Sequence, residues 1–211
     1  MIDFRFYLVT DRMRSAPRTL ASVVHDACVS GVRAVQLREK DLSETDLVSA
    51  ATRLVRLMRP HGAKLFVNAS PFVDRDTAGL LAASPGVDGF HIPDDAALLT
   101  EFRAQFPKLL IGASTHSVDG VRNAAESGAD FLTFGPVFAT GKKGRPQGLD
   151  ALREACNAAA IPVFAIGGVT PENARSCLDA GAHGVAVVGA VMGATSARSA
   201  VRAFAESMET L

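Results

Sequence analysis

The sequence contains no tryptophan and a single tyrosine, Tyr7, among its 211 residues. Proteins that hold single-stranded nucleic acid stack its bases on aromatic side chains, so a binding surface of that kind is not expected here. The charges also balance, with 22 basic and 22 acidic residues, which argues against a large basic face. We therefore expect neither nucleic acid nor an anionic membrane as a partner.

Long apolar runs and paired cysteines are lacking as well. No run approaches the roughly 18 residues of a membrane span, and residues 1–5 show no signal-peptide pattern. The 3 cysteines, Cys28, Cys156 and Cys177, each fall in a segment with helical periodicity. This favours buried free thiols in a reducing compartment over disulfides or a catalytic thiol. We expect a cytoplasmic protein.

Short apolar runs typical of buried parallel strands alternate with helical patterns along the chain. The runs cover residues 6–10, 34–38, 64–68, 89–92, 109–114, 131–135, 162–166 and 184–190. This order predicts a single-domain (β/α)₈ TIM barrel over residues 1–211, with its functional groups at the carboxyl ends of the strands. An open doubly wound sheet is the alternative, although no GxGxxG motif follows the first strand.

The last two predicted strands both end in glycine. Gly167 and Gly168 follow residues 162–166, and Thr170 and Pro171 are suited to begin the next helix. The free amides and the positive end of a helix dipole attract a phosphate. Val188 and Gly189 end the last predicted strand, and barrels bind phosphate after strands seven and eight. We therefore predict a phosphate site between these two turns.

Cationic and amide side chains follow the second and third strands. Alternation places Gln36, Arg38 and Lys40 on one side of the chain. If that side is the interior, an anionic ligand would offset the cost of burying two cations. Asn68 ends the third strand and could serve either a turn or a ligand.

Two histidines follow later strands. His91 is interpreted as a hydrogen-bonded barrel residue, whereas His116 follows Ser114 at the mouth and could exchange a proton near neutral pH. Ser117 is suited to cap the next helix. Residues 138–148 form a basic, glycine-containing loop that is either a lid over an anionic substrate or a solvated loop.

Five motifs in order resemble the thiamine-phosphate synthase superfamily, which also contains thiazole tautomerases. They are Tyr7-Leu8-Val9-Thr10-Asp11, Gln36-Leu37-Arg38-Glu39-Lys40, Ser114-Thr115-His116-Ser117, Gly135-Pro136-Val137-Phe138 and Ile166-Gly167-Gly168-Val169-Thr170. The resemblance covers nearly the whole chain. It implies a (β/α)₈ barrel that acts late in the assembly of vitamin B1, on a thiazole phosphate.

In the synthase, a thiazole displaces pyrophosphate from an aminopyrimidine diphosphate by way of a carbocation, with Mg²⁺ on the pyrophosphate. The resemblance implies that the pyrimidine and diphosphate would be held by Gln36, Arg38, Lys40, Asn68 and Lys143, with Ser114 nearby. Thr140, in the loop that carries Lys143, is a further expected substrate-binding residue. Two metal-binding carboxylates of the synthase pattern are missing: Ala69 replaces one, and Ala96 in Pro93-Asp94-Asp95-Ala96 replaces the other. Asp94 or Asp95 could substitute, which keeps the synthase as the alternative.

The tautomerase branch fits these departures, because it is similar in Asn68-Ala69-Ser70, His91-Ile92-Pro93 and Lys142-Lys143-Gly144. It implies a metal-free, cofactor-free isomerase in which His116 moves a proton and aromatises a carboxythiazole phosphate. A third alternative is a non-catalytic barrel that binds thiamine precursors as a regulator. The expected partner is thus a small thiazole phosphate, and a homodimer stays open.

Overall fold

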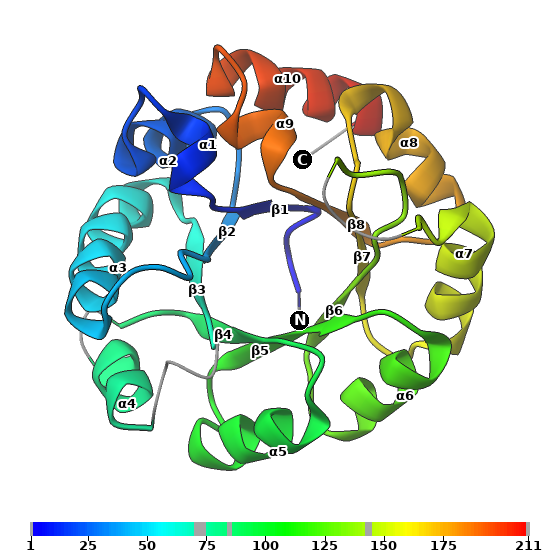
Figure 1. The fold of residues 1–211 in the computed structure, drawn as a ribbon, viewed down its shortest axis with the longest axis horizontal. Coiled ribbons are helices and arrows are strands. Elements are labelled where there is room, and N and C mark those ends of the chain that lie inside the picture. The colour runs from blue at the N-terminus through cyan, green and yellow to red at the C-terminus, as the bar shows by residue number, and fades with distance from the viewer. Residues whose placement is uncertain (1, 70–74, 84–85, 142–144, 210–211) are drawn as a thin grey trace.

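The computed structural model describes residues 2–69, 75–83, 86–141 and 145–209. Its parallel strands close into a barrel in chain order, and helices surround the barrel (Figure 1). The strands are β1 (Phe6–Val9), β2 (Ala34–Leu37), β3 (Lys64–Asn68), β4 (Gly89–Ile92), β5 (Leu110–Thr115), β6 (Phe131–Phe134), β7 (Val163–Ile166) and β8 (Gly184–Val187). The predicted (β/α)₈ barrel is confirmed.

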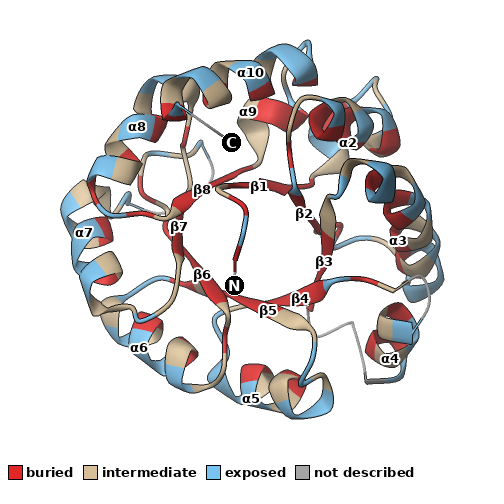
Figure 2. Ribbon diagram, turned by 180° about the vertical axis from the view of Figure 1, so that it is seen from behind, coloured by how far each residue is buried: buried red, intermediate tan, exposed pale blue. Residues whose placement is uncertain are grey.

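The helices follow the strands on the outside of the barrel. They are α1 (Arg12–Ser15), α2 (Leu20–Val29), α3 (Glu44–Met58), the 3₁₀ turn η1 (Arg59–His61), α4 (Arg75–Ala83), α5 (Ala96–Gln105), α6 (Val118–Glu126), α7 (Gly148–Ala158), α8 (Pro171–Asp179), α9 (Gly189–Met192) and α10 (Ala197–Met208). Figure 2 shows the buried faces of these helices turned toward the strands and their exposed faces turned outward.

Successive strand residues point to opposite faces of the barrel, which divides the core in two. Leu8, opposite Val187 where β1 closes on β8, belongs to the outer core between strands and helices. Tyr7, Phe66 and Phe131 belong to the inner core, and their rings meet edge to face. The interior of the barrel is therefore filled rather than open.

The segment before β1 closes the amino end of the barrel. The Phe4 ring lies 5.3 Å from that of Phe164 and 5.6 Å from that of Phe131, measured between centroids. Figure 1 accordingly shows the N-terminus at the centre of the ring of strands. Polar groups that are to meet a ligand therefore have to lie at the opposite, carboxyl end.

Capping residues mark the helix boundaries, and the short helices α1 and α9 were not predicted. The Ser43 Oγ accepts from the Asp46 N–H at 3.2 Å at the start of α3, and Gly31 follows α2 with a φ of 113°. The last strand does not run to residue 190 as predicted, because the backbone leaves the extended region at Val188 and α9 begins. One-turn helices such as α9 and α1 are too short to show periodicity in the sequence.

The cysteines are free thiols, as predicted. Cys28 and Cys177 are buried, and burial raises the pKa of each thiol to about 12. Cys156 is only half-buried, which corrects the expectation that all are buried. Within the described ranges, no helix combines the length and the apolar character that a membrane crossing requires.

Candidate active site

A pair of amide side chains lies at the carboxyl ends of β2 and β3. Gln36 is 3 % exposed, and its Nε2 donates to the Asn68 Oδ1 at 3.2 Å. The side of the chain that carries Gln36 therefore faces the interior, the case that the sequence left open. The bond holds both side chains in place and leaves the Gln36 Oε1 and the Asn68 Nδ2 as an acceptor and a donor for a ligand.

Arg38 continues the same face of the chain beyond β2. Its backbone N–H donates to the Thr10 Oγ1 at 2.9 Å, and its charge reaches the interior, where it helps to lower the pKa of His91. Lys40, two residues on, is exposed. The structure therefore brings Arg38 to the buried polar groups and leaves Lys40 at the rim.

His91 lies inside the barrel, below the mouth. Its Nδ1 is 3.4 Å from the Tyr7 Oη, and its Nε2 is 3.0 Å from the Ser114 Oγ and 3.5 Å from the Thr133 Oγ1. Burial, with a smaller effect of the Arg38 charge, lowers its pKa to about 3. The interpretation of His91 as a hydrogen-bonded barrel histidine is confirmed.

His116 occupies a different environment after β5. Its side chain is exposed at the mouth, and its Nδ1 lies 2.5 Å from the carbonyl oxygen of Gly135. A carbonyl only accepts, so this nitrogen carries the hydrogen, and Nε2 is left to exchange a proton. Ser117 caps α6 through the Gly120 N–H at 3.0 Å, as predicted.

Two glycines shape the turn between β7 and α8. Gly167 and Gly168 have φ angles of 95° and 66°, and a Cβ on Gly168 would lie 2.7 Å from the carbonyl oxygen of Ala139. Thr170 and Pro171 begin α8 as predicted, and Asn173 closes the turn by accepting from the Thr170 N–H and donating to the Gly168 carbonyl. Such a turn can receive an anion on its backbone amides.

The turn after β8 has a cation above it that the sequence interpretation missed. The Nη1 atom of Arg14 lies 3.3 Å from the position that a Cβ on Gly189 would occupy. The Nε of the same side chain donates to the Asp11 carboxylate at 2.9 Å. Val188 ends the strand just before this turn. The basic residues that directly follow the first strand could have indicated that Arg14 lies near the ligand.

Hydrogen bonds and ion pairs of Arg12 join the loops after β1 and β2. Both carboxylate oxygens of Glu39 accept from the Arg12 N–H, at 3.1 Å and 3.0 Å, and the Arg12 guanidinium forms a bidentate pair with Asp41. The pKa of Asp41 is lowered by this guanidinium. Because Glu39 is occupied in this way, it fixes the two loops rather than facing a ligand. The sequence interpretation missed this contact too.

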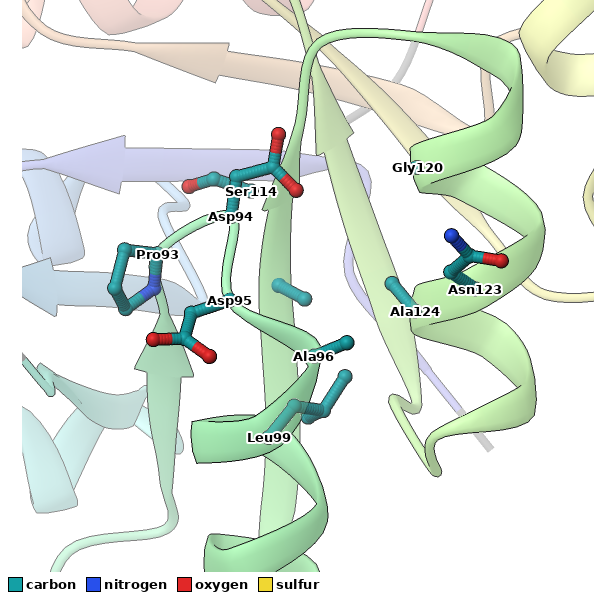
Figure 3. Close-up of a pocket in the computed structure, with 10 residues that line it drawn as sticks. Pro93, Asp94, Asp95, Ala96, Leu99, Ser114, Gly120, Asn123 and Ala124 are labelled. Carbon is teal, nitrogen blue, oxygen red and sulfur yellow. The ribbon is translucent and has the colours of Figure 1, made fainter.

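Asp94 and Asp95 differ in what they can still bind. Both are exposed and line a pocket of about 60 Å³ together with Ser114, but Asp95 also accepts from the Leu98 N–H at 3.0 Å as the N-cap of α5. In Figure 3 the two carboxylates point in different directions. Ala69 is fully buried and offers no side-chain ligand.

Other predicted residues of the site lie in the loop after β6. Thr140 is half-buried, and Lys143 lies outside the described residues together with part of the predicted lid 138–148. In the part of the chain that the structure describes, no cluster of three histidine, cysteine or acidic residues could hold a metal ion.

Comparisons with known proteins identify the family of the chain. A family model described as thiamine monophosphate synthase matches residues 6–191. The chain is 38% identical over 213 residues to the thiamine-phosphate synthase of Natronomonas pharaonis, covering 98% of this chain and 96% of that one. It is 40% identical over 194 residues to that of Albidiferax ferrireducens, covering 90% and 85%.

Solved structures show the same fold. The thiamine phosphate pyrophosphorylase from Pyrococcus furiosus superposes with a TM-score of 0.85 at 33% identity, covering 97% of this chain and 95% of that one. A 3-hexulose-6-phosphate synthase, at 15% identity and a TM-score of 0.73, shares the fold alone. The chain therefore belongs to the thiamine monophosphate synthase family and is an enzyme of thiamine biosynthesis.

Proposed function

We propose that the chain is a thiamine-phosphate synthase, which joins an aminopyrimidine diphosphate to a thiazole phosphate and releases pyrophosphate. The observation that carries this proposal is the match over nearly the whole chain to relatives of that name, at up to 40% identity in those given above. This reverses the order of preference that the missing carboxylates suggested from the sequence.

The pyrimidine and its diphosphate would lie on the side of β2 to β5. The Gln36 and Asn68 amides are hydrogen-bonded to each other. Their remaining donor and acceptor would face an acceptor and a donor of the aminopyrimidine ring. Arg38 and Lys40 would meet the diphosphate charge, with Thr140 and Lys143 closing from the loop after β6. As the bond between the pyrimidine methylene and the diphosphate breaks, these cations stabilise the leaving group.

The thiazole phosphate would lie on the opposite side, at the turns after β7 and β8. Gly167 and Gly168 keep that turn free of side chains, and Val188 and Gly189 form the facing turn. Backbone amides there would hold the phosphate and aim the thiazole at the pyrimidine methylene.

Mg²⁺ is the metal that this reaction implies, and the described residues at this end of the barrel offer one carboxylate that could hold it. Mg²⁺ in proteins is often held by one or two carboxylates together with substrate phosphates and waters. Asp94 is an exposed carboxylate at this end of the barrel, whereas Asp95 is used as a helix cap. Asp94 would hold the ion together with the diphosphate, where Mg²⁺ supplies charge neutralisation.

A metal-free thiazole tautomerase is the second candidate, and a specific observation favours it. Ala69 is fully buried where the synthase pattern has a carboxylate, and the bond between His116 and Gly135 leaves one imidazole nitrogen for proton transfer. Proton transfer needs a single group that both accepts and returns a proton, and no leaving group requires a metal.

A paired assay on the purified protein separates the two reactions. One arm contains aminopyrimidine diphosphate, thiazole phosphate and Mg²⁺ and measures thiamine phosphate; the other contains the carboxythiazole phosphate with EDTA and follows aromatisation. Product in the first arm supports the synthase, and product only in the second supports the tautomerase. Binding of both ligands without turnover in either arm would instead indicate a non-catalytic regulator.

A matched pair of variants tests the metal assignment. Asp94→Asn and Asp95→Asn each remove one negative charge from adjacent positions, and asparagine retains the ability to cap α5. Asp94→Asn should raise the Mg²⁺ concentration needed for half-maximal synthase activity, while Asp95→Asn should leave it close to that of the wild type. Equal effects of the two variants would contradict the role given to Asp94.

A further inference from the structure

A chain of hydrogen bonds runs through the barrel interior to the mouth, from Tyr7 through His91 to Ser114, and none of these residues has a role in the proposed function. Tyr7 is fully buried, and its Oη lies 3.4 Å from the His91 Nδ1. The other nitrogen of His91 lies 3.0 Å from the Ser114 Oγ. Tyr7 and Ser114 thus meet opposite edges of one imidazole ring.

Tyr7, at the buried end of this hydrogen-bond chain, determines which nitrogen of His91 carries the hydrogen. His91 is the hydrogen-bond partner that the structure gives the Tyr7 hydroxyl among the described residues. If Nδ1 carried the hydrogen, the Tyr7 oxygen would accept and its own proton would be left in the aromatic interior without an acceptor. A buried donor left in that state costs about 1–3 kcal/mol. The satisfied arrangement is the one in which Tyr7 donates to Nδ1.

The tautomer of His91 follows from this donation. The ring is neutral, because burial lowers its pKa to about 3, so one nitrogen carries a hydrogen and the other accepts. With Nδ1 as the acceptor, Nε2 carries the hydrogen and donates to the Ser114 Oγ. The Ser114 oxygen is thereby used as an acceptor, and its own proton points elsewhere.

Space for this ring depends on a glycine in the neighbouring strand. A Cβ on Gly112 would lie 2.6 Å from the His91 Nδ1 and closer still to the ring of Phe131. The ring is also packed among aromatic neighbours, with its centroid 5.7 Å from that of Tyr7 and 5.9 Å from that of Phe131. His91 is therefore held in one orientation, with its Nε2 toward the mouth.

We propose that Tyr7 and His91 are positioning residues that make Ser114 a hydrogen-bond donor toward the bound ligand. Ser114 is half-buried at the mouth and lines the pocket shown in Figure 3, so its hydroxyl proton is directed to an acceptor atom such as a ring nitrogen or an anionic oxygen. This role rests on the proposed function for the identity of the ligand. The tautomer assignment rests on the structure alone.

The first test reads the tautomer directly and needs no activity. Nitrogen NMR of the ¹⁵N-histidine-labelled protein distinguishes a protonated Nε2 from a protonated Nδ1 in each of the 5 histidines. His91 should carry its hydrogen on Nε2, while His116, bonded through Nδ1 to Gly135, should show the opposite tautomer in the same spectrum. A protonated Nδ1 on His91 would overturn the proposal. In Tyr7→Phe the preference of His91 for Nε2–H should weaken.

The second test asks whether this arrangement reaches the ligand. Calorimetric titration with aminopyrimidine diphosphate and, separately, with thiazole phosphate would compare Tyr7→Phe, Ser114→Ala and the double variant. Each single variant should weaken binding of the same ligand by about threefold to tenfold, as expected for one hydrogen bond. The double variant should be little worse than Ser114→Ala, because Tyr7 acts through Ser114.

A purely structural role would give a different pattern. Tyr7→Phe would then lower the melting temperature without changing the affinity for either ligand, or its effect would add fully to that of Ser114→Ala; either result overturns the proposal. If the wild type binds neither ligand, the proposed function fails, whereas the NMR spectrum still decides the tautomer of His91.

Discussion

The Nδ1 atom of His116 lies 2.5 Å from the carbonyl oxygen of Gly135, the last residue before the loop that follows β6. The same carbonyl accepts from the Gln147 Nε2 at 3.2 Å, at the far end of that loop. The Gly135 carbonyl therefore orients His116 and at the same time accepts a second hydrogen bond, from Gln147. One nitrogen of the ring is fixed as a donor, and the chemistry of the other depends on the ligand.

This geometry makes His116→Asn a selective variant. The asparagine amide can still donate to the Gly135 carbonyl, but it has no nitrogen in place of Nε2 to accept a proton. If the chain is a tautomerase, we expect a loss of about 10²–10⁴-fold in the rate of aromatisation, the usual contribution of a general acid–base group. Synthase activity should change little. Steady-state rates in both assays measure this, with His25→Gln as an exposed-histidine control. Equal losses in both would mean that His116 supports the mouth rather than the proton transfer.

Gly112 should be among the least tolerant positions of the barrel. A Cβ there would overlap the ring of Phe131 and crowd the His91 Nδ1, both of which are packed in the inner core. Overfilling a core in this way costs about 1–3 kcal/mol, so Gly112→Ala should lower the free energy of unfolding by that amount.

The matched control for this substitution is Gly79→Ala in α4. A Cβ on Gly79 would meet nothing within 4 Å, and alanine is the better helix former by about 0.5–1 kcal/mol. Urea denaturation should therefore show the two substitutions shifting the midpoint in opposite directions. A neutral Gly112→Ala would mean that the inner core can rearrange around His91.

Acid should destabilise the fold through His91. Its pKa is about 3 in the folded protein and 6.5 as the unperturbed value. Between these values the unfolded chain binds the proton that the folded one excludes, so the free energy of unfolding falls as pH falls, by up to about 1.4 kcal/mol per pH unit. Above the unfolded pKa both states are neutral at this residue and its effect vanishes.

The comparison of His91→Gln with the wild type isolates this contribution. Free energies of unfolding from urea titrations at several pH values between about 4 and 7 should fall less steeply in His91→Gln, whatever the absolute stability of the variant. Gly79→Ala, which changes no titratable group, should follow the wild-type slope. Parallel slopes for the wild type and His91→Gln would show that the folded protein admits a proton at this position.

The sequence was informative wherever local chemistry decides the structure. Continuous apolar runs predicted the strands, glycine and threonine predicted the turn before α8, and alternation placed Gln36 and Arg38 on the same side of the chain. Each of these depends on residues close together in the chain. It was also correct that His91 is a structural histidine, since a buried imidazole at the end of an apolar strand needs hydrogen-bond partners.

The contacts that could not be predicted join distant segments. Tyr7 and His91 are separated by 84 positions, and Arg12 and Glu39 by 27. Their meeting depends on the register and closure of the barrel rather than on a local pattern. The same limit affected the choice between reactions: the sequence showed that Ala69 lacks a carboxylate, but only the structure shows that, of the two exposed carboxylates Asp94 and Asp95, Asp95 caps a helix.

Arg14 should contribute to binding of the substrate phosphate. Its guanidinium lies over the turn at Gly189, and Asp11 orients it through Nε while an Nη1 lies close to the turn. A phosphate held by the turns after β7 and β8 would therefore meet a cation as well as backbone amides. Because Arg14 is half-exposed, solvent screens part of this attraction.

We expect Arg14→Gln to weaken binding of thiazole phosphate by about tenfold, in line with the loss of one charge-assisted hydrogen bond at a partly exposed site. Binding of the unphosphorylated thiazole alcohol should not change, because the lost interaction is with the phosphate. Calorimetric titration with the two ligands measures this difference. Arg122→Gln removes an exposed arginine on α6 that pairs with Asp119, and it should affect neither ligand. If Arg14→Gln weakens binding of both ligands equally, Arg14 stabilises the loop after β1 rather than contacting the phosphate. If Arg14→Gln binds thiazole phosphate with wild-type affinity, Arg14 does not contribute to the phosphate site.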